Sequence, residues 1–378
     1  MRLGFDGKRA TQNFRGLGNY SRGLIEGLLD YSEEEVFLYT PPIHDERAKR
    51  WLKENENQRL HIREPQSLIS RKLPSIWRSF GIVSDLKKDN LDLYHGLSHE
   101  IPVGVDGGKF KSVVTIHDLI FLRYPEFFPL IDRMTYKKKF SYAGKNADMV
   151  IAICEQTKRD LIEFLGVDEK KIVVHYQSCD PVFYEMRDFS EQKSLMAKYS
   201  FERPFILNVG AFEERKNQLA LIEAFGKIAN QVEQDLVLIG NGKKYLESCK
   251  KKVQDLGLSN RVHFLSNIPF SELPVFYQTA DLFCFPSHFE GFGLPIVEAL
   301  FSKTPVVTSF GSCFPESAGP DSVYIDPLSV ADISDKMLKV LNDVSLQENM
   351  IARGFDFVQQ FHRKNVNTKL LECYAKLF

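Results

Sequence analysis

The sequence predicts an α/β protein built from two doubly wound parallel-sheet domains. Its 378 residues exceed what one hydrophobic core usually organises, and two domains of roughly 150–200 residues are the natural expectation. Short apolar runs bounded by Gly, Pro or Asn alternate with longer amphipathic segments, and this alternation occurs twice along the chain. Strands that alternate with helices form βαβ units with parallel strands. Two such Rossmann-like domains face a central cleft at the carboxyl ends of their strands, where ligands of open α/β sheets bind.

The expected elements fall into two sets. Strands of the first half are predicted at 2–5, 36–39, 93–95, 112–116 and 149–153, and those of the second half at 205–209, 235–239, 262–265, 282–285 and 305–308. Helical patterns lie between them, for example at 19–29, 155–164, 217–229, 243–256 and 296–301.

The stretch 176–200 breaks this alternation with Cys179-Asp180-Pro181 and a charged, weakly apolar segment. We therefore expect a first domain at 1–190 and a second at 191–360. A C-terminal helix at 361–378 follows, with Val366, Leu370, Leu371 and Tyr374 on one stripe, and we expect it to cross back to the first domain.

Composition narrows the function classes. The chain is 43% hydrophobic and 26% charged with a net charge of −1, which is typical of a soluble globular protein and argues against nucleic acid as a partner. No stretch reaches the roughly 18 uninterrupted apolar residues that span a bilayer, and the start lacks the apolar core of a signal peptide. Six scattered cysteines without a Cys-x-x-Cys pair indicate reduced core thiols and a cytoplasmic location.

The strongest local signal runs from Glu290 to Glu298. An apolar strand ends at Pro286, a glycine-containing loop follows, and a helix begins near Pro295. Amide groups at such a helix start favour a phosphate or a polar sugar, and each carboxylate can accept hydrogen bonds from hydroxyl groups. The alternative is an incidental strand–loop–helix junction whose glutamates are solvated.

These residues resemble the signature of family 4 glycosyltransferases, retaining enzymes of the GT-B fold. The resemblance continues in 209–217, in the glycine turn 238–242 and in the strand 262–266. It implies that Glu290 contacts the donor sugar, that Glu298 binds the nucleotide ribose, and that Arg215 and Lys216 hold the donor diphosphate. The other donor-binding residues that it implies are Gly16, Gly18, Gly210, Gly240, Ser266, Gly291, Phe292, Gly293 and Leu294.

An adjacent Arg215 and Lys216 suit the chemistry, because a diphosphate leaving group needs fixed positive charge where negative charge develops. Without the family resemblance, an Arg-Lys pair in a loop is more often part of a solvated surface. Many relatives carry an arginine after the glycine where this chain has Ala211, which leaves more of the diphosphate to the pair.

The first half holds a loop, Gly16-Leu17-Gly18, between a strand and a helix, and it lacks the third glycine of a dinucleotide fingerprint. In similar proteins this loop faces the diphosphate and acceptor across the cleft. His117 occupies the position of the family histidine near the donor sugar, which makes it a catalytic candidate. The expected acceptor-side residues are Asn19, Tyr20, His95 and Asp118, although Asp118 could equally cap a helix.

We expect no metal and no cofactor, because the chain contains no Asp-x-Asp, a usual metal-diphosphate handle. Lys137, Lys138 and Lys139 lie among aromatic residues on an expected helix. A solvated helix face is the favoured interpretation. The alternative is peripheral contact with the anionic inner membrane, through which a lipid-linked acceptor is reached.

The sequence as a whole most resembles bacterial mannosyltransferases of surface polysaccharide or O-antigen synthesis. It predicts metal-independent transfer of a hexose to a hydroxyl of a saccharide or lipid-linked saccharide. The first choice for the hexose is mannose, with GDP-mannose as the donor. A non-catalytic sugar-nucleotide-binding module and a sugar-nucleotide epimerase of the same architecture are the alternatives.

Overall fold

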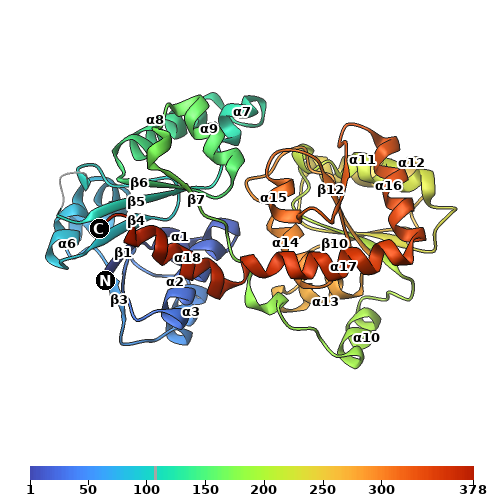
Figure 1. Cartoon of the computed structure of the whole chain (residues 1–378), viewed down its shortest axis with the longest axis horizontal. Coiled ribbons are helices and arrows are strands. Elements are labelled where there is room, and N and C mark those ends of the chain that lie inside the picture. The colour runs from blue at the N-terminus through green and yellow to red at the C-terminus, as the bar shows by residue number, and fades with distance from the viewer. Residues whose placement is uncertain (106–108) are drawn as a thin grey trace. The chain divides into compact units, whose positions relative to one another are not determined.

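A computed structural model describes residues 1–105 and 109–378 and divides the chain into two compact units. The first unit comprises Met1–Ser178 together with Arg363–Phe378, and the second comprises Cys179–His362. In each unit, helices cover both faces of a parallel sheet (Figure 1). The predicted fold class is confirmed.

The sheet of the first unit has seven strands in the order β3-β2-β1-β4-β5-β6-β7. Its strands are β1 (Arg2–Asp6), β2 (Glu35–Tyr39), β3 (Leu60–Arg63), β4 (Leu93–Gly96), β5 (Lys111–Ile116), β6 (Met149–Ala152) and β7 (Ile172–Val174). All pairings are parallel, so the carboxyl ends of these strands share one edge.

The helices of the first unit form the two outer layers. They are α1 (Lys8–Gln12), α2 (Gly16–Tyr31), α3 (Glu46–Glu54), α4 (Leu68–Lys72), α5 (Pro74–Ile76), α6 (Val83–Lys88), α7 (Ile120–Arg123), α8 (Leu130–Asn146), α9 (Glu155–Leu165) and α18 (Arg363–Ala375), with a π-helical turn η1 at Trp77–Gly81. Short 3₁₀ turns lie at Pro125–Phe127 and Glu169–Lys171. One core, with Phe37 and Phe140, lies on the α8 and α9 face, and a second, with Leu28 and Tyr374, lies beneath α2 and α18 (Figure 1).

The second unit has six parallel strands in the order β10-β9-β8-β11-β12-β13. They are β8 (Phe205–Val209), β9 (Asp235–Ile239), β10 (Val262–Leu265), β11 (Leu282–Phe285), β12 (Val306–Ser309) and β13 (Val323–Ile325). Its helices are α10 (Phe189–Lys198), α11 (Gln218–Ile228), α12 (Lys244–Asp255), α13 (Leu273–Thr279), α14 (Leu294–Phe301), α15 (Phe314–Ala318), α16 (Val330–Asn342) and α17 (Val344–Val358). Short 3₁₀ turns lie at Pro181–Phe183, Glu214–Lys216, Phe270–Glu272 and Gln359–Phe361.

The boundary between the units lies after Ser178, not at 190. The reason is local packing, because Phe183 meets the rings of Phe270 and Tyr277 edge-on, and Cys179 N donates to Phe361 O. The residues from 179 onward therefore belong to the second unit. The C-terminal helix α18 belongs to the first unit, where it packs against α2.

Three strands were not expected from the sequence, namely β3, β7 and β13. Each has three or four residues and lies at or near a sheet edge with partly exposed side chains. The expected loop Gly16-Leu17-Gly18 is wrong as well, because these residues form the first turn of α2. The six cysteines are buried and free, as the reduced-thiol interpretation requires.

Candidate functional site

Two cations meet one carboxylate at the carboxyl edge of the second sheet. Arg215 Nη1 lies 2.8 Å from Glu290 Oε2, and Lys216 Nζ lies 2.5 Å from Glu290 Oε1. The side chains come from the segments that follow β8 and β11, which are neighbours in the sheet. Burial alone would raise the pKa of Glu290, but the charges of Lys216 and Arg215 outweigh it and hold that pKa below its ordinary value. The two cations and Glu290 together carry one net positive charge, and Arg215 Nη2 also lies 3.4 Å from Oε2 of the exposed Glu213.

The loops after β8 and β9 hold these cations in place. Gly210 N donates to Ile239 O, and a Cβ on Gly240 would lie 1.9 Å from Gly210 O. The two loops therefore touch through their backbones, which only a glycine at 240 permits. After Lys216 the chain turns through Asn217, whose φ is 60° and whose amide donates to Pro286 O and Pro327 O. The expected site residue Ser266 follows β10 and is exposed.

The loop from Glu290 to Leu294 is held in place by side-chain packing and by a hydrogen bond to its backbone. Phe292 is buried against the ring of Phe361, and Cys313 Sγ donates to Glu290 O at 3.3 Å. Gly293, with φ of 90°, is the residue before α14, which starts at Leu294. Gly291 lies in the same loop and is partly exposed. Glu290, which meets Arg215 and Lys216, is therefore only four residues before this helix start.

Glu298 lies one turn inside α14 and accepts a hydrogen bond from Tyr277 Oη at 2.8 Å. Burial raises the pKa of Glu298 to about 7, opposed by that hydrogen bond and assisted by the charge of Asp180. Its carboxyl group therefore changes charge near neutral pH. Tyr277, on α13, has no signal in the sequence around it, because the contact joins residues 21 positions apart.

In the first unit, His117 follows β5 and is 4% exposed. Its Nε2 donates to Leu97 O at 2.9 Å, so Nδ1 is the acceptor, and Gln177 Nε2 donates to it at 2.8 Å. Burial lowers the pKa of His117 to about 4, with a further lowering by Arg9 and an opposing effect of the Leu97 hydrogen bond. The ring is thus neutral and held in one tautomer. Gln177 was not expected from the sequence, since it reaches His117 from beyond β7.

Three of the four expected acceptor-side residues, Tyr20, Asn19 and Asp118, lie in different surroundings. Tyr20 lies edge-on to His117, with ring centroids 4.6 Å apart, and its hydroxyl pairs with Thr115. Asn19 is exposed and accepts a hydrogen bond from Arg22. Asp118 Oδ1 accepts from Ile120 N, the first residue of α7, but the N-cap of this helix is Leu119 and not Asp118.

His95 is different, because it is fully buried in the core of the first unit. Its Nδ1 bonds Tyr374 Oη at 2.6 Å and its Nε2 bonds Thr115 Oγ1 at 2.8 Å. Both ring nitrogens are therefore used inside the fold, which leaves this side chain no face toward an acceptor. Its geometry corresponds to a structural link between β4, β5 and α18.

The matches to known proteins follow this division into units. The model of the glycosyl transferases group 1 matches residues 191–357, and that of glycosyltransferase family 4 matches residues 14–182. The chain belongs to the family 4 glycosyltransferases. The expected resemblance is confirmed.

Curated relatives of this glycosyltransferase include two from Escherichia coli. The O-antigen chain mannosyltransferase B is 28% identical over 289 residues, which are 75% of this chain and 74% of that one. The serotype-specific mannosyltransferase WbdA is 27% identical over 296 residues, which are 75% of this chain but 36% of WbdA. Among solved structures, Anabaena Alr3699/HepE in complex with UDP and glucose superposes with a TM-score of 0.80 at 18% identity, covering both chains completely. That likeness confirms the GT-B fold.

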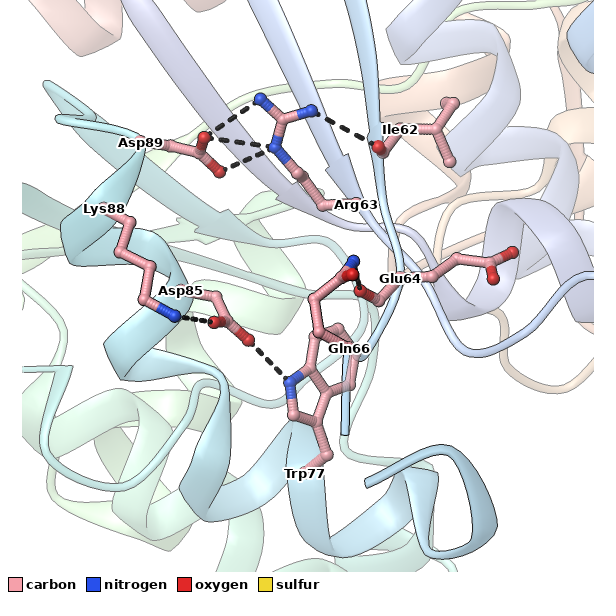
Figure 2. A pocket seen from close by; sticks show the side chains of 8 residues that line it. All are labelled: Ile62, Arg63, Glu64, Gln66, Trp77, Asp85, Lys88 and Asp89. Carbon is pink, nitrogen blue, oxygen red and sulfur yellow. Dashed lines mark hydrogen bonds and ion pairs between the residues drawn. The ribbon is translucent and has the colours of Figure 1, made fainter. Parts of the chain in front are cut away.

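The first unit of the glycosyltransferase also contains a cavity of about 340 Å³ beside the edge strand β3 (Figure 2). Most of its charged groups are paired with other lining residues, since Arg63 binds Asp89, and Asp85 accepts from Trp77 Nε1 and pairs with Lys88. None of the expected site residues lines it. We therefore assign the chemistry to the strand ends and not to this cavity.

Across residues 1–105 and 109–378, no group of three or more His, Cys, Asp or Glu side chains is arranged to hold a metal ion. Within the same described ranges, no helix is long and apolar enough to cross a membrane.

Proposed function

We propose that this glycosyltransferase moves a hexose from a nucleoside diphosphate sugar to a hydroxyl acceptor with retention of the anomeric configuration. The observation that carries the proposal is the meeting of Arg215, Lys216 and Glu290 beside the start of α14. A departing diphosphate develops negative charge, and preorganised cations at that point stabilise it. The cluster offers no unambiguous nucleophile, so we favour attack on the same face, assisted by the leaving phosphate.

The roles of the other residues follow from this scheme. Glu298 accepts hydrogen bonds from the ribose hydroxyls, and the amides of Gly291 to Leu294 bind the sugar together with Glu290. His117, as a neutral ring held by Leu97 and Gln177, lines the reaction centre. We further propose that Arg215 and Lys216 do the work that a metal ion does in other transferases, so that a chelator leaves turnover unchanged.

Replacement of Glu290 or Lys216 by Ala tests the reaction class. We expect each variant to lose about 10²–10³-fold in turnover, the usual effect of removing one transition-state donor. The matched control is Lys250→Ala in the same unit, since Lys250 is exposed and pairs only with Glu247 on the surface. Circular dichroism must show an unchanged fold. Wild-type turnover in either site variant would sink the assignment.

For the donor we propose GDP-mannose, with a role in surface polysaccharide or O-antigen synthesis. Support comes from the curated relatives, whose names specify mannosyl transfer. UDP-glucose or a deoxysugar nucleotide is the alternative, since the solved HepE complex holds UDP and glucose. Donor hydrolysis without acceptor, compared among GDP-mannose, UDP-glucose and dTDP-sugars, separates these choices. Absence of hydrolysis with all of them would favour a non-catalytic binding module.

We also propose that the protein works at the cytoplasmic face of the inner membrane through α8. Residues 130–139 are exposed apart from a half-buried Arg133, and they include Leu130 and Ile131 beside Lys137 and Lys138. Apolar side chains next to lysines suit an anionic bilayer surface. Neutralising the lysines at 137–139 should reduce sedimentation with vesicles containing anionic lipid. Unchanged sedimentation would remove the membrane contact and leave a solvated helix.

A further inference from the structure

A chain of ion pairs lies just beneath the carboxyl edge of the first sheet. Arg78 Nε donates to Asp6 Oδ2 at 3.1 Å, and Arg78 Nη2 donates to Glu100 Oε2 at 2.8 Å. Lys139 Nζ continues the chain to Glu100 Oε1 at 3.0 Å. Asp6 and Arg78 are buried. Two carboxylates and two cations alternate here, so their charges cancel.

Lys8 and Arg9 come shortly after the end of β1 and take no part in this chain of ion pairs. Both are half-buried, and within residues 1–105 and 109–378 neither has a carboxylate within 4.0 Å. Burial lowers the pKa of Lys8, and the charges of Arg78 and Arg9 lower it further against the opposing effects of Glu100 and Asp6.

His99 adds a neutral donor to the same region. Its Nδ1 accepts from His117 N at 3.3 Å, so the proton of the neutral ring is on Nε2. Burial, then His117 and Arg9, hold the pKa of His99 well below its ordinary value. The ring stacks on Phe140 at 4.4 Å with an interplanar angle of 7°, and the residue remains partly exposed.

The backbone of His99 is unusual too. Its φ is 65°, a left-handed conformation that costs a non-glycine residue about 1–2 kcal/mol. Such conformations persist where the surrounding structure imposes them, and they gather at binding sites. Here the conformation places the ring between Phe140 and His117, whose centroid is 5.1 Å away.

We propose that Lys8, Arg9 and His99 bind a phosphate group carried by the acceptor. The three side chains offer hydrogen-bond donors at the carboxyl edge of a parallel sheet, where ligands of such sheets bind. Ammonium and guanidinium groups without a counter-ion suit a phosphate. The proposal rests on the proposed transferase function, in which Arg215 and Lys216 of the other unit already serve the diphosphate of the donor. A second cation pair therefore implies a second anion.

Calorimetry of the full chain with inorganic pyrophosphate tests the site without any transfer reaction. The titration is run with a saturating nucleoside diphosphate, which occupies the donor site. We expect the wild type to bind pyrophosphate and the Lys8→Gln/Arg9→Gln variant to bind it about tenfold or more weakly, because hydrogen bonds between charged partners are the strong ones. His99→Gly, which keeps the left-handed backbone, should weaken binding by a smaller factor.

The matched control is Arg50→Gln/Lys53→Gln, which removes one arginine and one lysine from the exposed face of α3. It should bind pyrophosphate like the wild type, and nucleotide affinity should be unchanged in every variant. Circular dichroism excludes a folding defect. The conservative variant Lys8→Arg, which keeps the positive charge, should bind pyrophosphate like the wild type.

Two outcomes overturn the proposal. Undiminished pyrophosphate binding in the double variant places the anion elsewhere, and a matching loss of nucleotide affinity assigns the cations to the donor. The proposed function fails separately, through wild-type turnover of the Glu290 and Lys216 variants. Pyrophosphate binding that depends on Lys8 and Arg9 could still be observed even if the proposed transferase function were disproved.

Discussion

Single residues set the pH response of the site. Glu290 keeps its charge because two cations touch it, whereas Glu298 is buried and accepts a hydrogen bond from the neutral Tyr277 hydroxyl. The two carboxylates of one motif therefore behave oppositely, with the pKa of Glu290 lowered and that of Glu298 raised to about 7. This difference depends on partners outside the motif, and the motif alone does not reveal it.

Donor affinity should depend on pH through Glu298. A charged carboxylate accepts hydrogen bonds from both ribose hydroxyls, and a protonated one accepts fewer. We expect the KM for donor to rise as the pH falls below about 7 and to be flat above it. Tyr277→Phe removes a hydrogen bond that lowers the pKa, so it should move the midpoint to higher pH.

Steady-state kinetics between pH 5.5 and 8.5, as roughly the range in which this carboxyl titrates, measures the effect. Glu298→Gln is the control and should show a raised KM that this titration no longer modulates. A midpoint that Tyr277→Phe leaves in place would contradict the assignment.

The free energy of unfolding depends on pH in the opposite sense to donor affinity. The folded state binds the Glu298 proton more tightly than the unfolded chain does, so the free energy of unfolding falls as pH rises from 4.5 to about 7.

At the scale of elements, the first turn of α2 offers a matched pair of glycines. A Cβ on Gly18 would lie 1.6 Å from Asn13 O, whereas a Cβ on Gly16 would meet nothing within 4 Å. Gly18→Ala should therefore cost about 1–3 kcal/mol in unfolding free energy, as overpacking usually does. Gly16→Ala should stay within about 0.5 kcal/mol of the wild type. Urea unfolding measures both, and equal losses would contradict this packing.

The helix α18 is tied to the sheet by a buried hydrogen bond between Tyr374 and His95, and a second joins His175, after β7, to Val366 O. Tyr374→Phe leaves His95 Nδ1 without this partner in the core and should cost about 1–3 kcal/mol. Tyr31→Phe is the control, because Tyr31 is 42% exposed. Urea unfolding of both variants gives the comparison. A loss no larger than that of the control would mean that the bond contributes nothing to stability.

Sequence reasoning predicted the central strands and the edge strand β10 but missed the edge strands β3, β7 and β13, for a physical reason. The runs at β8 and β9 are mostly buried and apolar, with one polar residue each, so they can be predicted without knowledge of the neighbouring strands. The three-residue strands β7 and β13 are defined by pairing with one partner, which no local pattern encodes. Arg215 and Lys216 were predicted from adjacency and resemblance, but their contact with Glu290 follows from the pairing of β8 with β11. Gln177 and Tyr277 were missed because their roles arise from such long-range contacts alone.

At the scale of the whole molecule, the two units carry different parts of the proposed reaction. Most residues assigned to the donor, among them Gly210, Gly240 and Glu298, belong to the second unit, which has its own hydrophobic core, whereas Gly16 and Gly18 belong to the first. The polar network around His117 and the cations Lys8 and Arg9 belong to the first. We therefore expect a nucleotide without sugar or acceptor to bind mainly to the second unit.

Hydrogen exchange followed by mass spectrometry tests this division. GDP at about 100 times its Kd stabilises what it binds by about 2.7 kcal/mol, and the protection should appear in the segments after β8, β9 and β10 and at the start of α14. The helix α3 in the first unit is the internal control and should exchange at an unchanged rate. UDP at the same concentration should protect less, because we assign the donor as GDP-mannose. Equal protection by UDP would overturn the choice of base, and protection centred on the first unit would overturn the placement of the nucleotide.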